Sequence, residues 1–250
     1  MEESDKKSID LFGIKPFADS LKIGTQALVD GAAAFLGRIC LPAAEEFGFA
    51  LKDRVHNYRE INKVVMLQKA KQKLNKFTSE EGKHAHPRLV GAILNHGSWI
   101  DKEEIQDMWA GLLASACTED GQDDSNLIFI NILSQITRLQ ASVLNYACEN
   151  VEKELSEAGF IASKNELIVE LQDLKKITDC DDFHRLDREL DHLRALDGYG
   201  MLSGGFGQHN TDADITPTGF AIQMYVRCQG YIGPPDEYFD IKKDKEPEES

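Results

Sequence analysis

Three histidines are the first residues of this chain whose type and spacing could support chemistry. His84, His86 and His96 could offer imidazole ligands to a metal ion. No Cys or acidic residue stands at a spacing that would complete a ligand set. The sequence therefore predicts a polar loop before a helix, and neither a metal nor another cofactor is expected.

The glycine-rich segment 204–207 could be taken for a loop that cradles a phosphate. Such loops lie between a strand and the N-terminus of a helix, where backbone N–H groups point at the anion. Here the glycines lie inside a predicted hairpin and are followed by a second strand. We therefore interpret this segment as the hairpin of a small β-structure.

Arg185 and His192 are separated by six residues, a spacing that resembles the motif of the helical HEPN ribonucleases. In that motif the histidine would act as general acid or base and the arginine would hold the phosphate. Leu186 stands where the motif has a polar residue, and a charge-rich helix produces the spacing by chance. A ribonuclease that uses Arg185 and His192 is one alternative hypothesis.

The main candidate for a binding surface is the segment 51–77, which has a net charge of +6 from eight Lys or Arg residues and two acids. The rest of the chain carries −21, because the whole chain has a net charge of −15. Apolar residues recur every three or four positions, so we expect one long helix with a basic face. Such a face either binds a polyanion or an acidic partner, or pairs with acidic surface of its own protein. The candidate residues are Arg54, Arg59, Lys63, Lys69, Lys71, Lys73 and Lys76.

Nearly all the elements that must position these residues are predicted helices. With 250 residues and 42% hydrophobic residues, the chain can bury a substantial core. Residues 101–104 resemble a capping box, and Trp109 lies on the apolar face of the helix that follows. Trp109 is therefore expected to be buried. The overall prediction is a mainly α protein.

The apolar pattern from about residue 139 onward is typical of a winged-helix domain. Helix, helix, helix, Gly-rich hairpin and closing helix follow in that order, and we expect Thr216 to cap the closing helix with Pro217 at its first position. The helix that would read DNA lies within 181–197, which holds six acids and three arginines. Expected pairs are Arg185 with Glu189 and Arg188 with Asp191. A protein-binding or architectural winged helix is favoured over a transcription factor, because few cations remain for phosphate.

These patterns divide the chain into four parts. We expect a polar N-terminal segment 1–24, a helical domain 25–138, a winged-helix-like domain 139–230 with a short β-hairpin, and an acidic disordered tail 231–250. The five cysteines form no Cys-x-x-Cys and no signal peptide is evident, so reduced thiols in a cytoplasmic protein are expected. The small-residue segment 23–44 contains charged residues and is not expected to span a membrane.

Three segments resemble the abortive infection alpha family. Residues 35–48 resemble its small-residue motif, residues 100–114 its acidic, Trp-centred helix, and residues 126–141 a segment that usually starts with His-Pro. This chain has Asn126 and Leu127 in place of His-Pro, and it has Gly111 where an Asn is common. The resemblance implies a role in bacterial defence against phage by abortive infection, and it implies no particular reaction.

The leading hypothesis is therefore a non-enzymatic interaction protein in anti-phage defence, which acts through self-association or a protein partner. The alternatives are a nucleic-acid-binding effector that uses the basic helix 51–77, and the HEPN-like ribonuclease. The surroundings of the basic helix discriminate between the first two. Lysines buried against acidic surface favour the interaction protein, whereas a continuous solvent-facing stripe favours the polyanion-binding effector.

Overall fold

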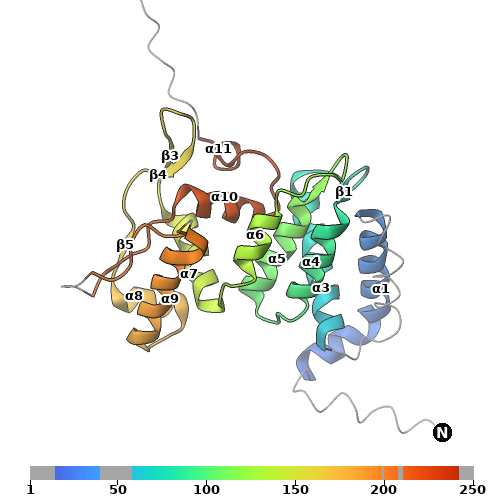
Figure 1. Ribbon diagram of the computed structural model, residues 1–250. Coiled ribbons are helices and arrows are strands. Elements are labelled where there is room, and N and C mark those ends of the chain that lie inside the picture. The colour runs from blue at the N-terminus through green and yellow to red at the C-terminus, as the bar shows by residue number, and fades with distance from the viewer. Residues whose placement is uncertain (1–14, 40–57, 199, 208–210, 242–250) are drawn as a thin grey trace, which may run out of the picture.

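The computed structural model describes residues 15–39, 58–198, 200–207 and 211–241, and it confirms the mainly α fold class (Figure 1). The helices are α1 (Lys15–Ile39), α3 (Tyr58–Phe77), α4 (Pro87–Gly97), α5 (Glu103–Ser115), α6 (Leu127–Leu133), α7 (Arg138–Asn150), α8 (Leu171–Thr178), α9 (Phe183–Ala195), the 3-10 turn η2 (Leu196–Gly198), α10 (Gly219–Cys228) and α11 (Pro235–Tyr238). The strands are β1 (His84–Ala85), β2 (Cys117–Thr118), β3 (Lys153–Leu155), β4 (Ile161–Ser163), β5 (Ile168–Val169) and β6 (Ala213–Asp214). They pair antiparallel as β1–β2, β3–β4 and β5–β6.

Helix α5 is the central element of the core and is buried on almost every side. Helices α3, α4, α6, α7 and α10 all pack against it. Its residues from Met108 to Ser115 are all buried, and none of them is charged. Trp109 is 1% exposed and its ring stacks on that of His96 with the centroids 5.8 Å apart. The prediction that Trp109 is buried is therefore confirmed.

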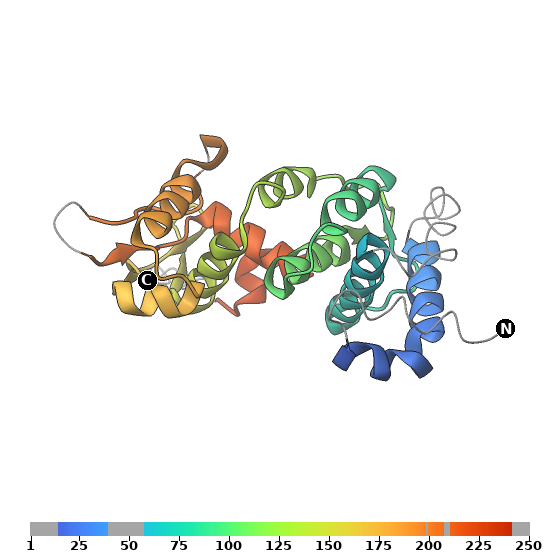
Figure 2. The same cartoon turned by 90° about the horizontal axis from the view of Figure 1, so that it is seen from below.

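The closing helix α10 joins the C-terminal part of the chain to this core. It crosses α5 at Gly111, where an added Cβ would lie 1.6 Å from the carbonyl oxygen of Cys228. Only glycine allows the two backbones to approach so closely. Figure 2 shows α10, in red, between α5 and the helices α7 to α9. One hydrophobic cluster runs across the predicted domain boundary at residues 138 and 139.

The C-terminal part is built from short helices and two strand pairs. Helices α7 and α9 lie where periodicity predicted them, and a capping box of Thr137 and Gln140 begins α7. Strand β5 pairs with β6, and isolated bridges join Leu202 to Pro217 and Phe206 to Ala213. The expected hairpin is therefore present. The assignment of this part to the winged-helix class stays a prediction.

Two predicted helix starts are wrong. Helix α5 begins after Lys102, which makes no side-chain cap, so residues 101–104 form no capping box. Helix α10 is capped by Thr218 and begins at Gly219, two residues later than the cap predicted at Thr216. The later start of α10 is caused by tertiary contacts. The backbone of Thr216 accepts a hydrogen bond from the N–H of Ser203, and Pro217 bridges Leu202, so the chain stays extended through both residues.

The predicted boundaries at the two ends also differ from the structure. Helix α1 already begins at Lys15, inside the segment 1–24 that was expected to be a separate polar segment. The prediction of a disordered tail from residue 231 is wrong for residues 231–241, which include α11 and pack aromatic side chains on the core. Tyr231 lies edge-on to Phe77, and Phe239 stacks on Tyr225. These contacts outweigh the acidic composition of the segment.

No helix of the described residues is long and apolar enough to cross a membrane. Helix α1, which contains most of the small-residue segment, packs Val29, Phe35 and Leu36 into the common core instead. Residues 40–57, with the predicted start of the basic helix and Arg54, lie outside the described residues.

Candidate functional site

Helix α3 carries the candidate binding residues and lies between α1 and α5. Its apolar stripe of Met66, Leu67, Ala70 and Leu74 is completely buried, which fixes the direction in which the basic side chains point. Because residues three and four apart share a helix face, Lys69 and Lys73 project together toward the neighbouring helix α5. The apolar period of residues 51–77 predicts one long helix, and the described part of that segment, Tyr58–Phe77, is helical.

The basic side chains in the middle of α3 are paired with carboxylates of the same chain. Lys69 Nζ lies 3.5 Å from Asp107 Oδ1 and 3.7 Å from Glu103 Oε1, and Lys73 Nζ lies 2.7 Å from Asp107 Oδ2. Lys73 also donates a hydrogen bond to Gln229 Oε1 over 3.3 Å. Asp107 of α5 thus pairs with two lysines where the two helices pack, and Glu103 supplies a second negative charge beside Lys69.

The other lysines of α3 make different contacts: two of them pair with carboxylates, and the third lies beside an aromatic ring. Lys63 pairs with Glu60 over 2.8 Å, and Lys71 pairs with Glu80 over 3.4 Å. Glu80 also accepts from Arg38 of α1. The ammonium of Lys76 lies 5.1 Å from the ring centroid of Phe77. Among the described residues, the predicted stripe is therefore largely neutralised within the molecule and is not a continuous cationic surface.

Arg59, at the start of α3, is built into a different feature, the Arg59–Trp99 stack. Its guanidinium lies 4.2 Å from the ring centroid of Trp99, and Trp99 is 58% exposed. The guanidinium Nε donates to Ser98 Oγ over 3.0 Å, and Nη2 donates to Asn95 Oδ1 over 3.2 Å. The stack is therefore held in place by the end of α4 while the indole faces solvent.

Trp99 was not among the predicted site residues. It follows Gly97 in the connection between α4 and α5, where no periodicity distinguishes an exposed from a buried aromatic residue. The one signal in the sequence for an exposed side chain was the position of this tryptophan in a short connection rather than on the apolar face of a helix.

Arg185 and His192 do not form an open pair of catalytic groups. Arg185 Nε donates to Glu189 Oε1 over 3.5 Å, which confirms the predicted pair. The Nδ1 of His192 accepts from Gln140 Nε2 over 2.8 Å, and Gln140 also donates to the backbone carbonyl of Glu189. His192 thus takes part in the contact between α7 and α9, and Arg185 pairs within α9.

The other predicted pair on α9 has a different partner. Asp191 pairs with Arg194, 2.9 Å away, where Arg188 was predicted. The spacing of three positions is the same in both directions along the helix, so sequence alone does not choose between them.

The three histidines serve separate structural purposes. His84 Nδ1 hydrogen-bonds with the backbone carbonyl of Arg38, and His86 accepts from the backbone N–H of Arg88 at the start of α4. His96 stacks on Trp109. Within the described ranges, no group of three His, Cys, Asp or Glu residues could hold a metal ion.

Comparison with protein families gives one match. The family model described as abortive infection alpha matches residues 62–202, more than half of the chain. The matched region begins in α3 and ends just after η2, so it includes Trp99, all the lysines of α3 and the Arg185–His192 helix. The curated proteins and the solved structures gave no match.

Proposed function

The chain belongs to the abortive infection alpha family, and we propose that it acts in bacterial defence against phage as a non-enzymatic cytoplasmic effector that works through a protein contact. The contact is with a second copy of the chain or with a protein partner. The observation that carries the proposal is the neutralisation of the α3 lysines by carboxylates of the same chain, above all at Asp107.

This neutralisation favours the protein contact over the polyanion-binding alternative. Binding to a nucleic acid gains free energy when free cations replace the counterions of the phosphates. Lys69 and Lys73 would first have to leave Asp107, and Lys71 would have to leave Glu80. The net charge of −15 adds a general repulsion from nucleic acid. The basic stripe is therefore better suited to hold α1, α3 and α5 together.

The Arg59–Trp99 stack is the surface on which we place the protein contact. Tryptophan and arginine are the residue types that most often dominate the binding energy of protein interfaces. Here the guanidinium is already oriented by Ser98 and Asn95, so little conformational freedom remains to be lost when a partner covers the indole.

The test is a plaque assay in bacteria that express the protein, combined with sedimentation of the purified chain. Trp99→Ala is expected to lower protection against a sensitive phage at least tenfold. It is also expected to abolish either the formation of a dimer or the co-purification of a partner protein from infected cells. The matched control is Phe160→Ala, because Phe160 is 71% exposed at the tip of the β3–β4 hairpin. Both variants are expected to keep the circular-dichroism spectrum of the wild type.

Full protection by Trp99→Ala would contradict the contact at this stack. Loss of protection in Phe160→Ala alone would move the contact to the hairpin. Two results together would favour the nucleic-acid alternative. The wild type would bind a labelled oligonucleotide at physiological salt, and replacing the α3 lysines with glutamine would weaken that binding.

A further inference from the structure

A pocket of about 390 Å³ opens between α6, α10 and the segment that leads into α11. Its volume lies in the range of small-molecule sites. Seven apolar residues line it, together with three polar side chains and Gly233. The apolar lining comes from Ile128, Phe129, Phe220, Val226, Ile232, Pro234 and Pro235.

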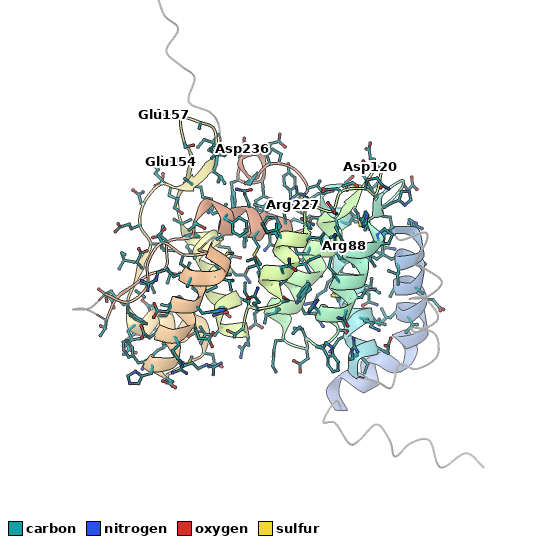
Figure 3. All side chains as sticks on the ribbon, in the orientation of Figure 1. Arg88, Asp120, Glu154, Glu157, Arg227 and Asp236 are labelled. Carbon is teal, nitrogen blue, oxygen red and sulfur yellow. The ribbon has the colours of Figure 1, made fainter. Side chains whose placement is uncertain are left out.

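Arg227 is the one cation among the residues that line this pocket. It lies in the last turn of α10, and Figure 3 shows it where the end of this helix approaches α6. Its Nη1 atom is buried and has no hydrogen-bond partner. Burial lowers the pKa of the guanidinium, and the carboxylate of Asp123 partly opposes that effect. Asp123 itself accepts from the backbone N–H of Ser125 and forms no ion pair with Arg227 within the described residues.

Two further hydrogen-bonding side chains face the same space. Gln223 lies one turn before Arg227 on the same side of α10, and Ser125 lies across the pocket just before α6. The side chains of both residues are exposed and are not engaged with other described residues. An amide N–H, a hydroxyl and a guanidinium, all donors, thus converge beside a wall of aromatic and proline rings.

An arginine that only stabilised the fold would be expected to pair with a carboxylate or carbonyl. Leaving a charged donor buried without a partner costs about 1–3 kcal/mol or more. The nearby cap of α10 at Thr218 is satisfied. The cost at Arg227 therefore points to a group that is supplied from outside the chain.

We propose that this pocket binds a small organic anion with an apolar body. Its carboxylate or phosphate oxygens accept from the Arg227 guanidinium, with Gln223 and Ser125 as additional donors. Its apolar part lies against Phe129, Phe220 and the proline pair. Arginine suits this role because its planar fork binds two oxygens of one oxyanion at once.

The test uses the full chain and isothermal titration calorimetry with four probes: benzoate, phenyl phosphate, the neutral benzamide and inorganic phosphate. At least one of the two aromatic anions is expected to bind at least tenfold more tightly than both benzamide and inorganic phosphate. The stronger of the two identifies the head group. Arg227→Gln is expected to weaken that probe at least tenfold, since hydrogen bonds to charged groups are the strong ones. The matched control is Arg88→Gln, an exposed arginine of α4 that lines no part of the pocket.

Thermal unfolding separates binding from a structural role. Without ligand, Arg227→Gln is expected to unfold at the same temperature as the wild type or higher, because the variant removes an unpaired buried charge. A saturating aromatic anion is expected to raise the unfolding temperature of the wild type and not of the variant. Failure of both aromatic anions to bind, equal binding by Arg227→Gln, or a lower unfolding temperature of the free variant would overturn the proposal.

Discussion

Replacing Gly111 with alanine is expected to lower the free energy of unfolding by about 2 kcal/mol or more. The added Cβ would lie 1.6 Å from the carbonyl oxygen of Cys228 and 2.2 Å from its carbonyl carbon. Real Cβ atoms essentially never approach closer than 3.0 Å, so α5 and α10 would have to separate by roughly 1.4 Å. The obstacle is backbone, which cannot rotate away as the end of a side chain can.

Two opposing effects set that magnitude. Alanine in the interior of a helix is favoured over glycine by about 0.5–1 kcal/mol. Overpacking a core costs about 1–3 kcal/mol, and more where a helix has to move. The balance is a net loss because the shift would also loosen the contacts that α10 makes with α7. Gly31 offers the matched control, since an added Cβ on this exposed residue of α1 meets nothing within 4 Å.

The measurement is urea unfolding followed by circular dichroism, with the midpoints compared at a common slope. Gly31→Ala is expected to shift the midpoint upward, by about 0.5–1 kcal/mol in free energy. Gly111→Ala is expected to shift it downward. A Gly111→Ala protein as stable as the wild type would show that α10 does not cross α5 at this point, and the joining of the two halves through α10 would fail with it.

Trp109→Ala is expected to cost about 3–5 kcal/mol in urea unfolding, because it removes the largest fully buried side chain of α5; a loss below about 1 kcal/mol would place the indole at the surface. Asp107→Asn is expected to cost at most about 1 kcal/mol, since the carboxylate is partly exposed. That loss should shrink in high salt, and an unchanged loss would mean that charge is not its cause. The purified wild type is expected to leave a mixed RNA pool intact, as is His192→Ala; RNA cleavage abolished in His192→Ala would restore the ribonuclease hypothesis. Burial raises the pKa of the Cys148 thiol to about 12, so the folded chain keeps a proton that the unfolded chain loses above about pH 9. The free energy of unfolding should therefore fall as the pH rises beyond 9, by up to about 1.4 kcal/mol per pH unit from this group. Cys148→Ala should decline less steeply, and an identical decline would assign the effect elsewhere.

The helices could be predicted where the signals that form them are local. The apolar period of α9 and the residues that begin α4 and α7 lie within a few positions of each other in the sequence. The start of α10 could not be predicted in that way. Thr216 and Thr218 are both good capping residues, and the choice is made by Ser203 and Leu202, which hold the chain extended up to Pro217.

The C-terminal segment shows a related difficulty. Acidic residues dominate the composition of 231–250, and averaging over that range hides the aromatic residues at its beginning. The rings of Tyr231 and Tyr238 contact the ring of Phe77 at the end of α3, which is far away along the chain. A disordered segment is expected only where no apolar surface is available to bury, and the availability of that surface is a property of the fold.

Charge counts along the sequence also miss tertiary contacts, and at the candidate sites these contacts determine which cations have a counterion. Counting charges by segment selects α3, because Lys69 and Lys73 stand in a run with few acids. The count does not show that Asp107 of α5 lies against both lysines. Arg227 is the reverse case, a single arginine in the mostly apolar helix α10 that no charge count would select. A cation is available for a ligand only when its own chain has left it without a counterion. By that criterion Arg227 is a better candidate than any of the paired lysines of α3, and the comparison of Arg227→Gln with Arg88→Gln tests this criterion directly.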